Sequence, residues 1–357
     1  MGNGHGIGER GSAMTPPTDR TAPPGGPGGS GGSLSDDAAL RIFRTMTTIR
    51  LTENRIVRGL NSGELTMTFY TVRGQEAIPA AMGEHLLPED YMVTTYRGVH
   101  DCIAKGVPLD ELLAEMCGKY TGTSKGKGGP MHLSDPHSGL MVTTGVVGGG
   151  LPIAVGLALS SQLRGDGRVT VVNFGDGATS IGATHEAVNL AALWQLPVVF
   201  VCQNNRYGEH TKFADYTRSS SLAERFATYG LSARSVDGNS IEAMSEAAET
   251  AIAQARSGGG PTFLECMTYR LGGHSFGSTT EYMDPDELAQ AEADEPVGRN
   301  RRWLLEDRGI PEAVLSDMEA AVGAEVEAAI AFAKASEPPP ASELVTDVFS
   351  SLAASPR

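Results

Sequence analysis

Asp176 and Asn205 are the residues of this sequence whose types and spacing indicate the most specific chemistry. Asp176 stands inside a Gly-Asp-Gly motif at residues 175–177, and Asn205 is the second member of an Asn-Asn pair. A carboxylate and an amide each offer an oxygen to Mg²⁺, which usually completes its coordination with phosphate oxygens of a bound substrate. The two glycines allow the backbone to pass close to a diphosphate. The pattern therefore predicts a site for a diphosphate that carries a divalent cation.

Both residues closely follow short apolar runs that are rich in β-branched side chains. These runs, Val169–Phe174 and Pro197–Cys202, are typical of buried parallel strands. Between them, His185–Trp194 places apolar side chains at a helical period. The expected βαβ unit has a right-handed crossover. Because ligands bind outside the carboxyl ends of the strands in open α/β sheets, Asp176 and Asn205 should lie at the same ligand edge.

The rest of the chain continues this alternation. Ser232–Val236 and Pro261–Tyr269 are expected to be strands, and helices are expected from an N-cap at Ser35 onward. We therefore predict the α/β class, with a parallel sheet flanked by helices and a helical C-terminal extension. The extension is expected to consist of the helical stretches Asp284–Glu295, Arg299–Arg308 and Pro311–Ala335.

The composition excludes several classes of protein. The 357 residues carry a net charge of −15, which argues against binding to nucleic acid or to an anionic membrane surface. No stretch approaches the roughly eighteen apolar residues of a membrane span, and the four cysteines form no CxxC pair. Residues 1–34 are rich in Gly and Pro and are expected to be a disordered leader, followed by one domain at residues 35–357. The cytoplasm is the expected location.

Two glycine-rich segments resemble nucleotide-binding loops in composition. Gly122–His132 contains Lys125 and Lys127, but it lacks the order GxxxxGK[ST] and a preceding strand, so we reject a P-loop. Thr143–Leu159 passes from glycines into an apolar helix, but its spacing does not match a dinucleotide fingerprint and no strand is expected before it. The backbone of this second loop can still approach a ligand closely.

From residue 40 to residue 335 the sequence resembles the alpha subunit of the decarboxylating first component of 2-oxo acid dehydrogenase complexes. That group includes pyruvate, branched-chain and acetoin dehydrogenases, and the acetoin type looks most similar. A GDG motif, 26 further residues and then NN is similar to the thiamin diphosphate motif of such enzymes. The other motifs that carry the resemblance are GQEA at Gly74, YRG at Tyr96, CIAKG at Cys102, KGKGG at Lys125, GVVGGG at Gly145, NNRYG at Asn204 and YRLGGHS at Tyr269.

The resemblance implies the thiamin diphosphate-binding fold and assigns roles to individual residues. Asp176 and Asn205 would hold Mg²⁺ together with the backbone carbonyl of Tyr207. A guanidinium such as that of Arg97 can grip two phosphate oxygens at once. The expected cofactor-binding residues are Tyr96, Arg97, Gly145, Val147, Asp176, Gly177, Ala178, Asn205, Tyr207 and His274. The expected catalytic residues are His274, Tyr70 and His100.

The resemblance also implies a reaction and partners. In the family, the cofactor takes up the electrons released when CO₂ leaves a 2-oxo acid, and an acyl group passes to a lipoyl group on an acyltransferase component. A Glu of the beta subunit activates the cofactor ring in two-subunit members, and no matching segment occurs in this chain. We therefore expect an obligate beta subunit, an α₂β₂ tetramer, and a small 2-oxo acid or acetoin as substrate.

Two positions on the expected substrate side depart from the family pattern. Tyr70 and Val99 stand where relatives often have histidines, and His100 follows directly after Val99. One interpretation is neutral drift, with pyruvate or acetoin retained. Another is a transketolase-like transfer of a two-carbon ketol unit from a ketose phosphate to a lipoyl or acyl-carrier acceptor. A non-catalytic scaffold is a third, which the intact cofactor motif opposes. Ser275 and Ser278 lie where some relatives are phosphorylated.

Overall fold

A computed structural model describes residues 34–347 of the chain. The leader expected at residues 1–34 lies outside these residues, apart from Leu34 itself. The boundary between leader and domain therefore stays a prediction.

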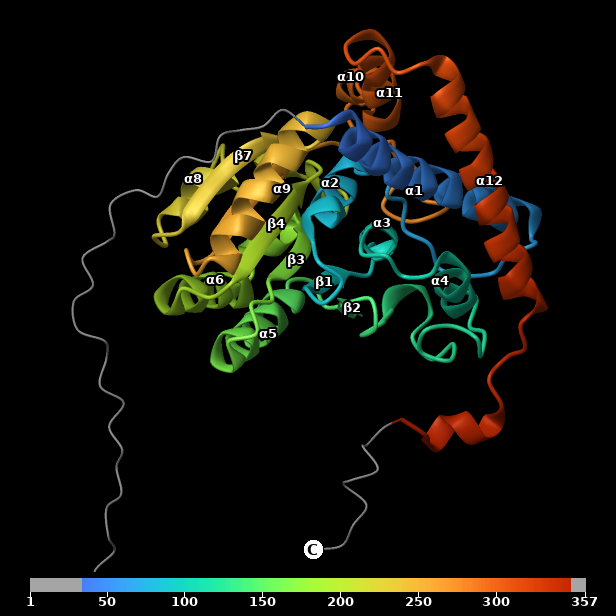
Figure 1. Ribbon diagram of the computed structural model, residues 1–357, viewed down its shortest axis with the longest axis horizontal. Coiled ribbons are helices and arrows are strands. Elements are labelled where there is room, and N and C mark those ends of the chain that lie inside the picture. The colour runs from blue at the N-terminus through green and yellow to red at the C-terminus, as the bar shows by residue number, and fades with distance from the viewer. Residues whose placement is uncertain (1–33, 348–357) are drawn as a thin grey trace, which may run out of the picture. The chain divides into compact units, whose positions relative to one another are not determined.

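Six strands form one parallel sheet in the order β2-β1-β3-β4-β8-β7 (Figure 1). The predicted βαβ unit is confirmed, since β3 pairs in parallel with β4 and α6 connects them. In the sheet, β2 lies beside β1 at one edge, whereas β4 lies beside β3 in the opposite direction. The strand order therefore reverses between β1 and β3. The strands are β1 (Tyr91–Thr95), β2 (Leu140–Thr144), β3 (Thr170–Gly175), β4 (Val198–Asn204), β7 (Ser232–Asp237) and β8 (Thr262–Met267). A separate hairpin pairs β5 (Tyr207–Gly208) with β6 (Thr211–Lys212).

Helices cover both faces of the sheet, which confirms the predicted α/β class (Figure 1). On one face, α5, α6 and α8 enclose an apolar cluster that includes Phe174, Phe200 and Phe263. On the other face, α2 and α9 pack against Val171 and Val199. The alternating direction of strand side chains supplies both clusters from the same strands. The helices are α2 (Ala77–His85), α5 (Gly150–Arg164), α6 (Gly182–Trp194), α8 (Leu222–Ala227) and α9 (Ile241–Arg256).

The first helix, α1 (Asp36–Ser62), begins at the predicted N-cap. The Ser35 side chain accepts a hydrogen bond from the Ala38 amide at 3.3 Å, and Gly63 ends the helix with φ of 73°. The predicted helical extension is confirmed, and α12 packs against both α1 and α4. The remaining helices are α3 (Val99–Ala104), α4 (Leu109–Met116), α7 (Phe213–Tyr216), α10 (Pro285–Ala293), α11 (Pro296–Glu306) and α12 (Glu312–Ala335). Short 3₁₀ turns occupy η1 (Gly129–Met131), η2 (Asp176–Ser180) and η3 (Ala341–Val345).

A buried carboxylate organises the glycine-rich segment Gly122–His132. Glu115 is fully buried in α4, and each of its oxygens accepts two backbone N–H groups. These donors are Ser124 and Gly126 on Oε2, both at 2.8 Å, and Gly128 and Gly129 on Oε1, at 2.8 and 3.1 Å. Lys125 and Lys127 point elsewhere and form ion pairs with Glu343 and Asp347. A helix rather than a strand precedes the segment, in agreement with the rejection of a P-loop.

The second glycine-rich segment does follow a strand, so the expectation that none precedes it is wrong. Strand β2 ends at Thr144, directly before Gly145. It is an edge strand in which three of the five residues are only partly buried, and its sequence lacks the longer apolar run of β3 and β4.

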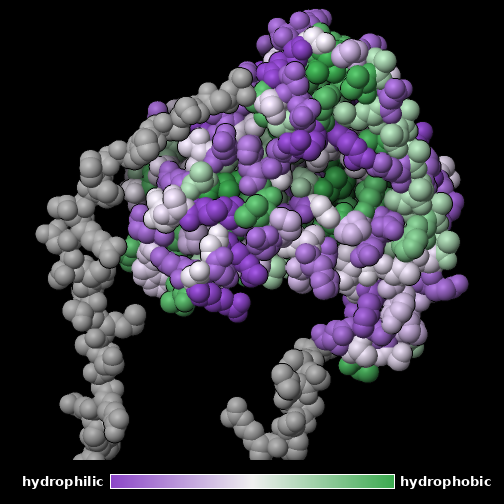
Figure 2. Space-filling view, in the orientation of Figure 1, coloured by the Kyte–Doolittle hydropathy of each residue, from purple (hydrophilic) through white to green (hydrophobic). Residues whose placement is uncertain are grey.

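The visible face of the molecule is chemically mixed. Figure 2 shows hydrophilic residues over most of it, with hydrophobic residues in patches, several of them along α12. None of the helices within residues 34–347 is long and apolar enough to cross a bilayer.

Candidate active site

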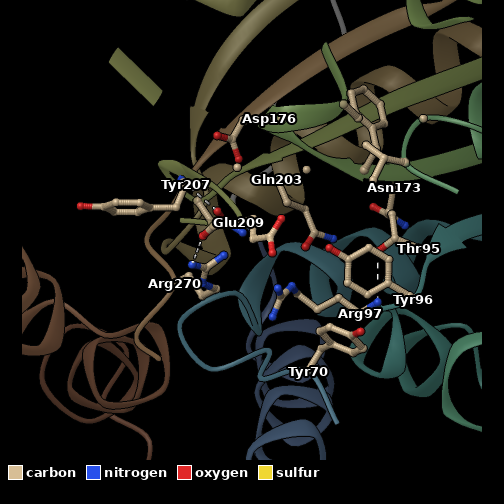
Figure 3. A pocket seen from close by; sticks show the side chains of 18 of the residues that line it. Tyr70, Thr95, Tyr96, Arg97, Asn173, Asp176, Gln203, Tyr207, Glu209 and Arg270 are labelled. Carbon is tan, nitrogen blue, oxygen red and sulfur yellow. Dashed lines mark hydrogen bonds between the residues drawn. The ribbon is translucent and has the colours of Figure 1, made fainter. Parts of the chain in front are cut away.

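The carboxyl ends of β1 to β4 surround a cavity of about 570 Å³. It lies where the strand order reverses between β1 and β3, which is where open α/β sheets bind their ligands. Each strand contributes residues that follow its carboxyl end: Arg97 after β1, Gly145 after β2, Asp176 after β3 and Asn205 after β4. Figure 3 shows Arg97 and Asp176 among the side chains of this lining. The fold thus brings distant motifs to one edge of the sheet.

The Asp176 carboxylate is buried at the cavity. The residue is 1% exposed, and its Oδ2 accepts a hydrogen bond from the Tyr216 hydroxyl. Its Oδ1 has no hydrogen-bond partner among the described residues. Burial raises the pKa of this carboxyl above its usual range. Because a buried carboxylate oxygen without a partner is costly, a bound cation is the group that would satisfy it.

The Asn205 side chain is held in place beside this carboxylate. Its Nδ2 donates to Gln75 Oε1 at 2.9 Å, and its Oδ1 accepts from the Tyr207 amide at 3.3 Å. A Cβ on Gly177 would lie 3.2 Å from the Cα of Gly208, so the glycine permits this close approach of two backbones. Within residues 34–347 no three His, Cys, Asp or Glu side chains cluster as a metal site. A cation here would therefore need amide, carbonyl and ligand oxygens.

Two buried arginines face the cavity. Arg97 is 8% exposed and Arg270 is 1% exposed, and neither forms an ion pair within the described part of the chain. Arg97 donates to the carbonyls of Thr71 at 2.6 Å and His274 at 3.0 Å. Burial, and next the charge of Arg270, lower the pKa of Arg97 to about 10. Two buried cations that form no ion pair among the described residues indicate that the cavity can bind an anion.

His274 is an imidazole that packs against the rings of Tyr70 and Tyr96. Arg97 Nη2 lies 3.3 Å from His274 Nδ1, and a guanidinium can only donate, so the ring proton belongs on Nε2. Burial, followed by the charges of Arg97 and Arg270, lowers the pKa of His274 to about 4. Tyr70 packs edge-on against Tyr96 and His274, at centroid distances of 4.5 and 5.4 Å. His274 can therefore offer a hydrogen bond from Nε2 at neutral pH.

The structure brings nearly all the residues expected from the sequence to this cavity. The expected residues that line it are Tyr70, Tyr96, Arg97, Gly145, Val147, Asp176, Gly177, Ala178, Asn205, Tyr207 and His274. His100 is not brought to it. His100 is 1% exposed, and its Nε2 lies 2.8 Å from Gln203 Oε1, behind the cavity lining. Helix α3 begins at Val99 and turns this side chain toward β4.

Val99, whose position was expected to influence the substrate, also lies away from the cavity. It is 7% exposed and belongs to an apolar cluster with Phe69 and Met92. Of the two departures from the family pattern, Tyr70 alone contributes to the lining.

Several lining residues were missed from the sequence. Asn173 and Gln203 are buried polar residues on β3 and β4, and neither polar atom of Asn173 has a hydrogen-bond partner among the described residues. Gln75 lies beneath Asn205, and Glu209 follows the hairpin strand β5. A signal for the first two existed, because each polar amide interrupts an apolar strand just before its carboxyl end.

Comparisons with known proteins show which proteins this chain is similar to. A family profile described as "Dehydrogenase E1 component" matches residues 44–342. The alpha subunit of acetoin:2,6-dichlorophenolindophenol oxidoreductase from Bacillus subtilis is 41% identical over 318 residues, which span 89% of this chain and 95% of that protein. The protein of the same name from Cupriavidus necator is 36% identical and covers 88% and 95%. The alpha subunit of the pyruvate dehydrogenase E1 component from Rhizobium meliloti is 32% identical and covers 89% and 91%.

Proposed function

Since this chain belongs to the dehydrogenase E1 component family, we propose that its cavity binds thiamin diphosphate together with Mg²⁺. The chain is the alpha subunit of a thiamin diphosphate-dependent dehydrogenase for a 2-oxo acid or acetoin, and it acts with a beta subunit. One observation carries the proposed metal site. Within residues 34–347, an Asp176 oxygen without a hydrogen-bond partner and two buried arginines without an ion pair occupy a single cavity.

The residues present fit the magnesium salt of a diphosphate. Asp176 Oδ1, Asn205 Oδ1 and the carbonyl of Tyr207 would hold the metal, and Arg97 would face the phosphates. A hard dication beside Asp176 offsets the burial of its charge. The backbone around Gly145 and Val147 would support the ring system of the cofactor.

The cofactor, when bound, supplies the electron sink for breaking a bond next to a carbonyl. The protein's own contribution is to bind, to orient and to donate. His274 holds its proton on Nε2 and can donate it as a hydrogen bond to a substrate oxygen. The partly buried rings of Tyr70 and Tyr96 pack edge-on and form an aromatic lining on that side of the cavity.

The proposal extends to the assembly and its location. Val147 lines the cavity and is 50% exposed, and its neighbour Val146 is 68% exposed, so the two form an apolar edge suited to cover by a protein partner. We propose an α₂β₂ tetramer that passes its acyl group to a lipoyl-bearing acyltransferase component. Cys102, Cys202 and Cys266 are buried as free thiols, in keeping with the cytoplasm as the proposed location.

Dye reduction by the alpha chain co-purified with its beta subunit tests the function. Pyruvate, a branched 2-oxo acid, acetoin and a ketose phosphate are offered in turn, with and without thiamin diphosphate and Mg²⁺. We expect reduction with one of the first three and dependence on both additions. Reduction with the ketose phosphate alone would make ketol transfer the function, for which Tyr70 in the lining is the favouring observation. Turnover by the alpha chain alone would contradict the two-subunit site.

A further inference from the structure

A two-residue turn places an acidic side chain beside the candidate active site. Glu209 and His210 connect β5 to β6, directly after the residues that would hold the metal. Glu209 adopts a left-handed backbone with φ of 55°, which a non-glycine residue rarely adopts without support. The support comes from the buried Arg270, whose Nη2 donates a hydrogen bond to the Glu209 carbonyl at 2.7 Å. The turn is therefore held in one position by the interior of the protein.

The side chain of Glu209 belongs to the cavity. It is among the lining residues, and Figure 3 shows its carboxylate directed into the space near Gln203 and Arg97. Three acidic side chains line the cavity, and the other two, Asp101 and Asp176, are each 1% exposed. Glu209 is the exposed one, and it has no ion-pair partner within residues 34–347.

None of the basic side chains near Glu209 within the described residues pairs with its carboxylate. The nearby His274 is neutral at physiological pH, since its pKa is lowered to about 4. Arg97 is directed to two backbone carbonyls, and under the proposed function it also faces the diphosphate. Arg270 is occupied by the carbonyls of Glu209 and Gly272 and by the hydroxyl of Tyr282. A substrate in the cavity would therefore lie near a carboxylate that forms no ion pair among the described residues and can interact with the substrate.

We propose that Glu209 is a specificity-determining residue that favours an uncharged 2-hydroxyketone over an anionic 2-oxo acid. The inference rests on the proposed function and deepens it by naming the substrate class. A carboxylate accepts a strong hydrogen bond from a substrate hydroxyl. The same carboxylate repels the carboxylate of a 2-oxo acid, and like-charge juxtaposition is an effective means of rejecting a competitor.

The test compares substrates in the complex of the alpha chain with its beta subunit. The Glu209→Gln variant removes the charge and keeps the size of the side chain. We expect the ratio of kcat/KM for pyruvate to kcat/KM for acetoin to rise roughly fivefold. That is the size that Coulomb's law gives for a unit charge about 8 Å away at an effective dielectric constant of about 40. The KM of the native complex for pyruvate should also fall with added salt, and the variant should lose that dependence.

Two further variants make the test specific. Glu281→Gln is the matched control, because Glu281 is an exposed acid outside the lining without an ion pair in the described part of the chain. It should leave the substrate ratio unchanged. Glu209→Gly removes the charge while suiting the positive φ, so it serves if the glutamine variant is poorly folded.

Binding of oxamate, an unreactive anion with the shape of pyruvate, gives a readout that does not depend on turnover. Calorimetry on the complex loaded with thiamin diphosphate and Mg²⁺ should show several-fold tighter oxamate binding in Glu209→Gln than in the native complex. A substrate ratio and an oxamate affinity that both stay within twofold of native would overturn the role of Glu209. Failure of the proposed function is distinguishable, since the native complex would then neither bind the cofactor nor reduce dye.

Discussion

Replacing Asp176 by Asn should change the stability of the protein in opposite directions with and without the cofactor. Asp176 is buried, its pKa is raised by that burial, and its bond to the Tyr216 hydroxyl is one that an asparagine oxygen can also accept. The substitution therefore removes a costly buried charge and keeps the hydrogen bond. Without cofactor we expect the variant to be more stable than the native chain by about 1–2 kcal/mol.

The cofactor should reverse that order. With thiamin diphosphate and Mg²⁺ at 100 times the dissociation constant, the native complex should gain about 2.7 kcal/mol of unfolding free energy. The variant lacks the carboxylate of the proposed metal site, Asp176 Oδ1, and should gain almost nothing.

Thermal unfolding of the complex with its beta subunit measures both effects. Four scans are needed: native and Asp176→Asn, each with and without thiamin diphosphate and Mg²⁺. Chelation of Mg²⁺ should return the native complex to its value without cofactor. If the variant gains as much stability from the cofactor as the native protein, Asp176 does not hold the metal. If the variant is less stable in both states, the account of its buried charge is wrong.

Three further predictions concern other parts of the cavity and its support. Glu115→Gln should lower the unfolding free energy by about 3–6 kcal/mol in urea denaturation, because an amide can accept for only two of the four N–H donors on Glu115 and turns its own donors toward the other two. The neutral His274 resists protonation in the folded state, so folding stability should fall as pH drops from about 6.5 toward 4, and His274→Gln should flatten that slope in pH-dependent denaturation. If the rate of dye reduction changes with pH only between pH 6 and 8, that change cannot be assigned to the titration of His274. Val99→His should destabilise the apolar cluster by about 2 kcal/mol or more without changing substrate preference, whereas Tyr70→His should alter KM for the substrate in steady-state assays.

Much of the fold was predictable because central strands have a recognisable local pattern, a short run of β-branched apolar residues. The β-branched runs at Val169–Phe174 and Pro197–Cys202 became β3 and β4, shifted by one or two residues at their ends. The edge strand β2 was missed, since an edge strand need not be apolar throughout. Helix α9 spans Ile241–Arg256, and its buried apolar positions run from Ile241 to Ala255.

The sequence by itself determined which kind of ligand this protein can bind. Asp176 and Asn205 follow two neighbouring strands, and parallel strands must end at the same edge, so their meeting required no tertiary information. Only the tertiary structure decided which polar neighbours face the ligand. His100 and Glu209 lie equally close to recognisable motifs, yet helix α3 turns His100 behind Gln203 while Arg270 fixes Glu209 at the cavity. The direction of these two side chains depends on the helix or turn that carries them and on hydrogen bonds to residues far away in the sequence, which neighbouring residues alone do not determine.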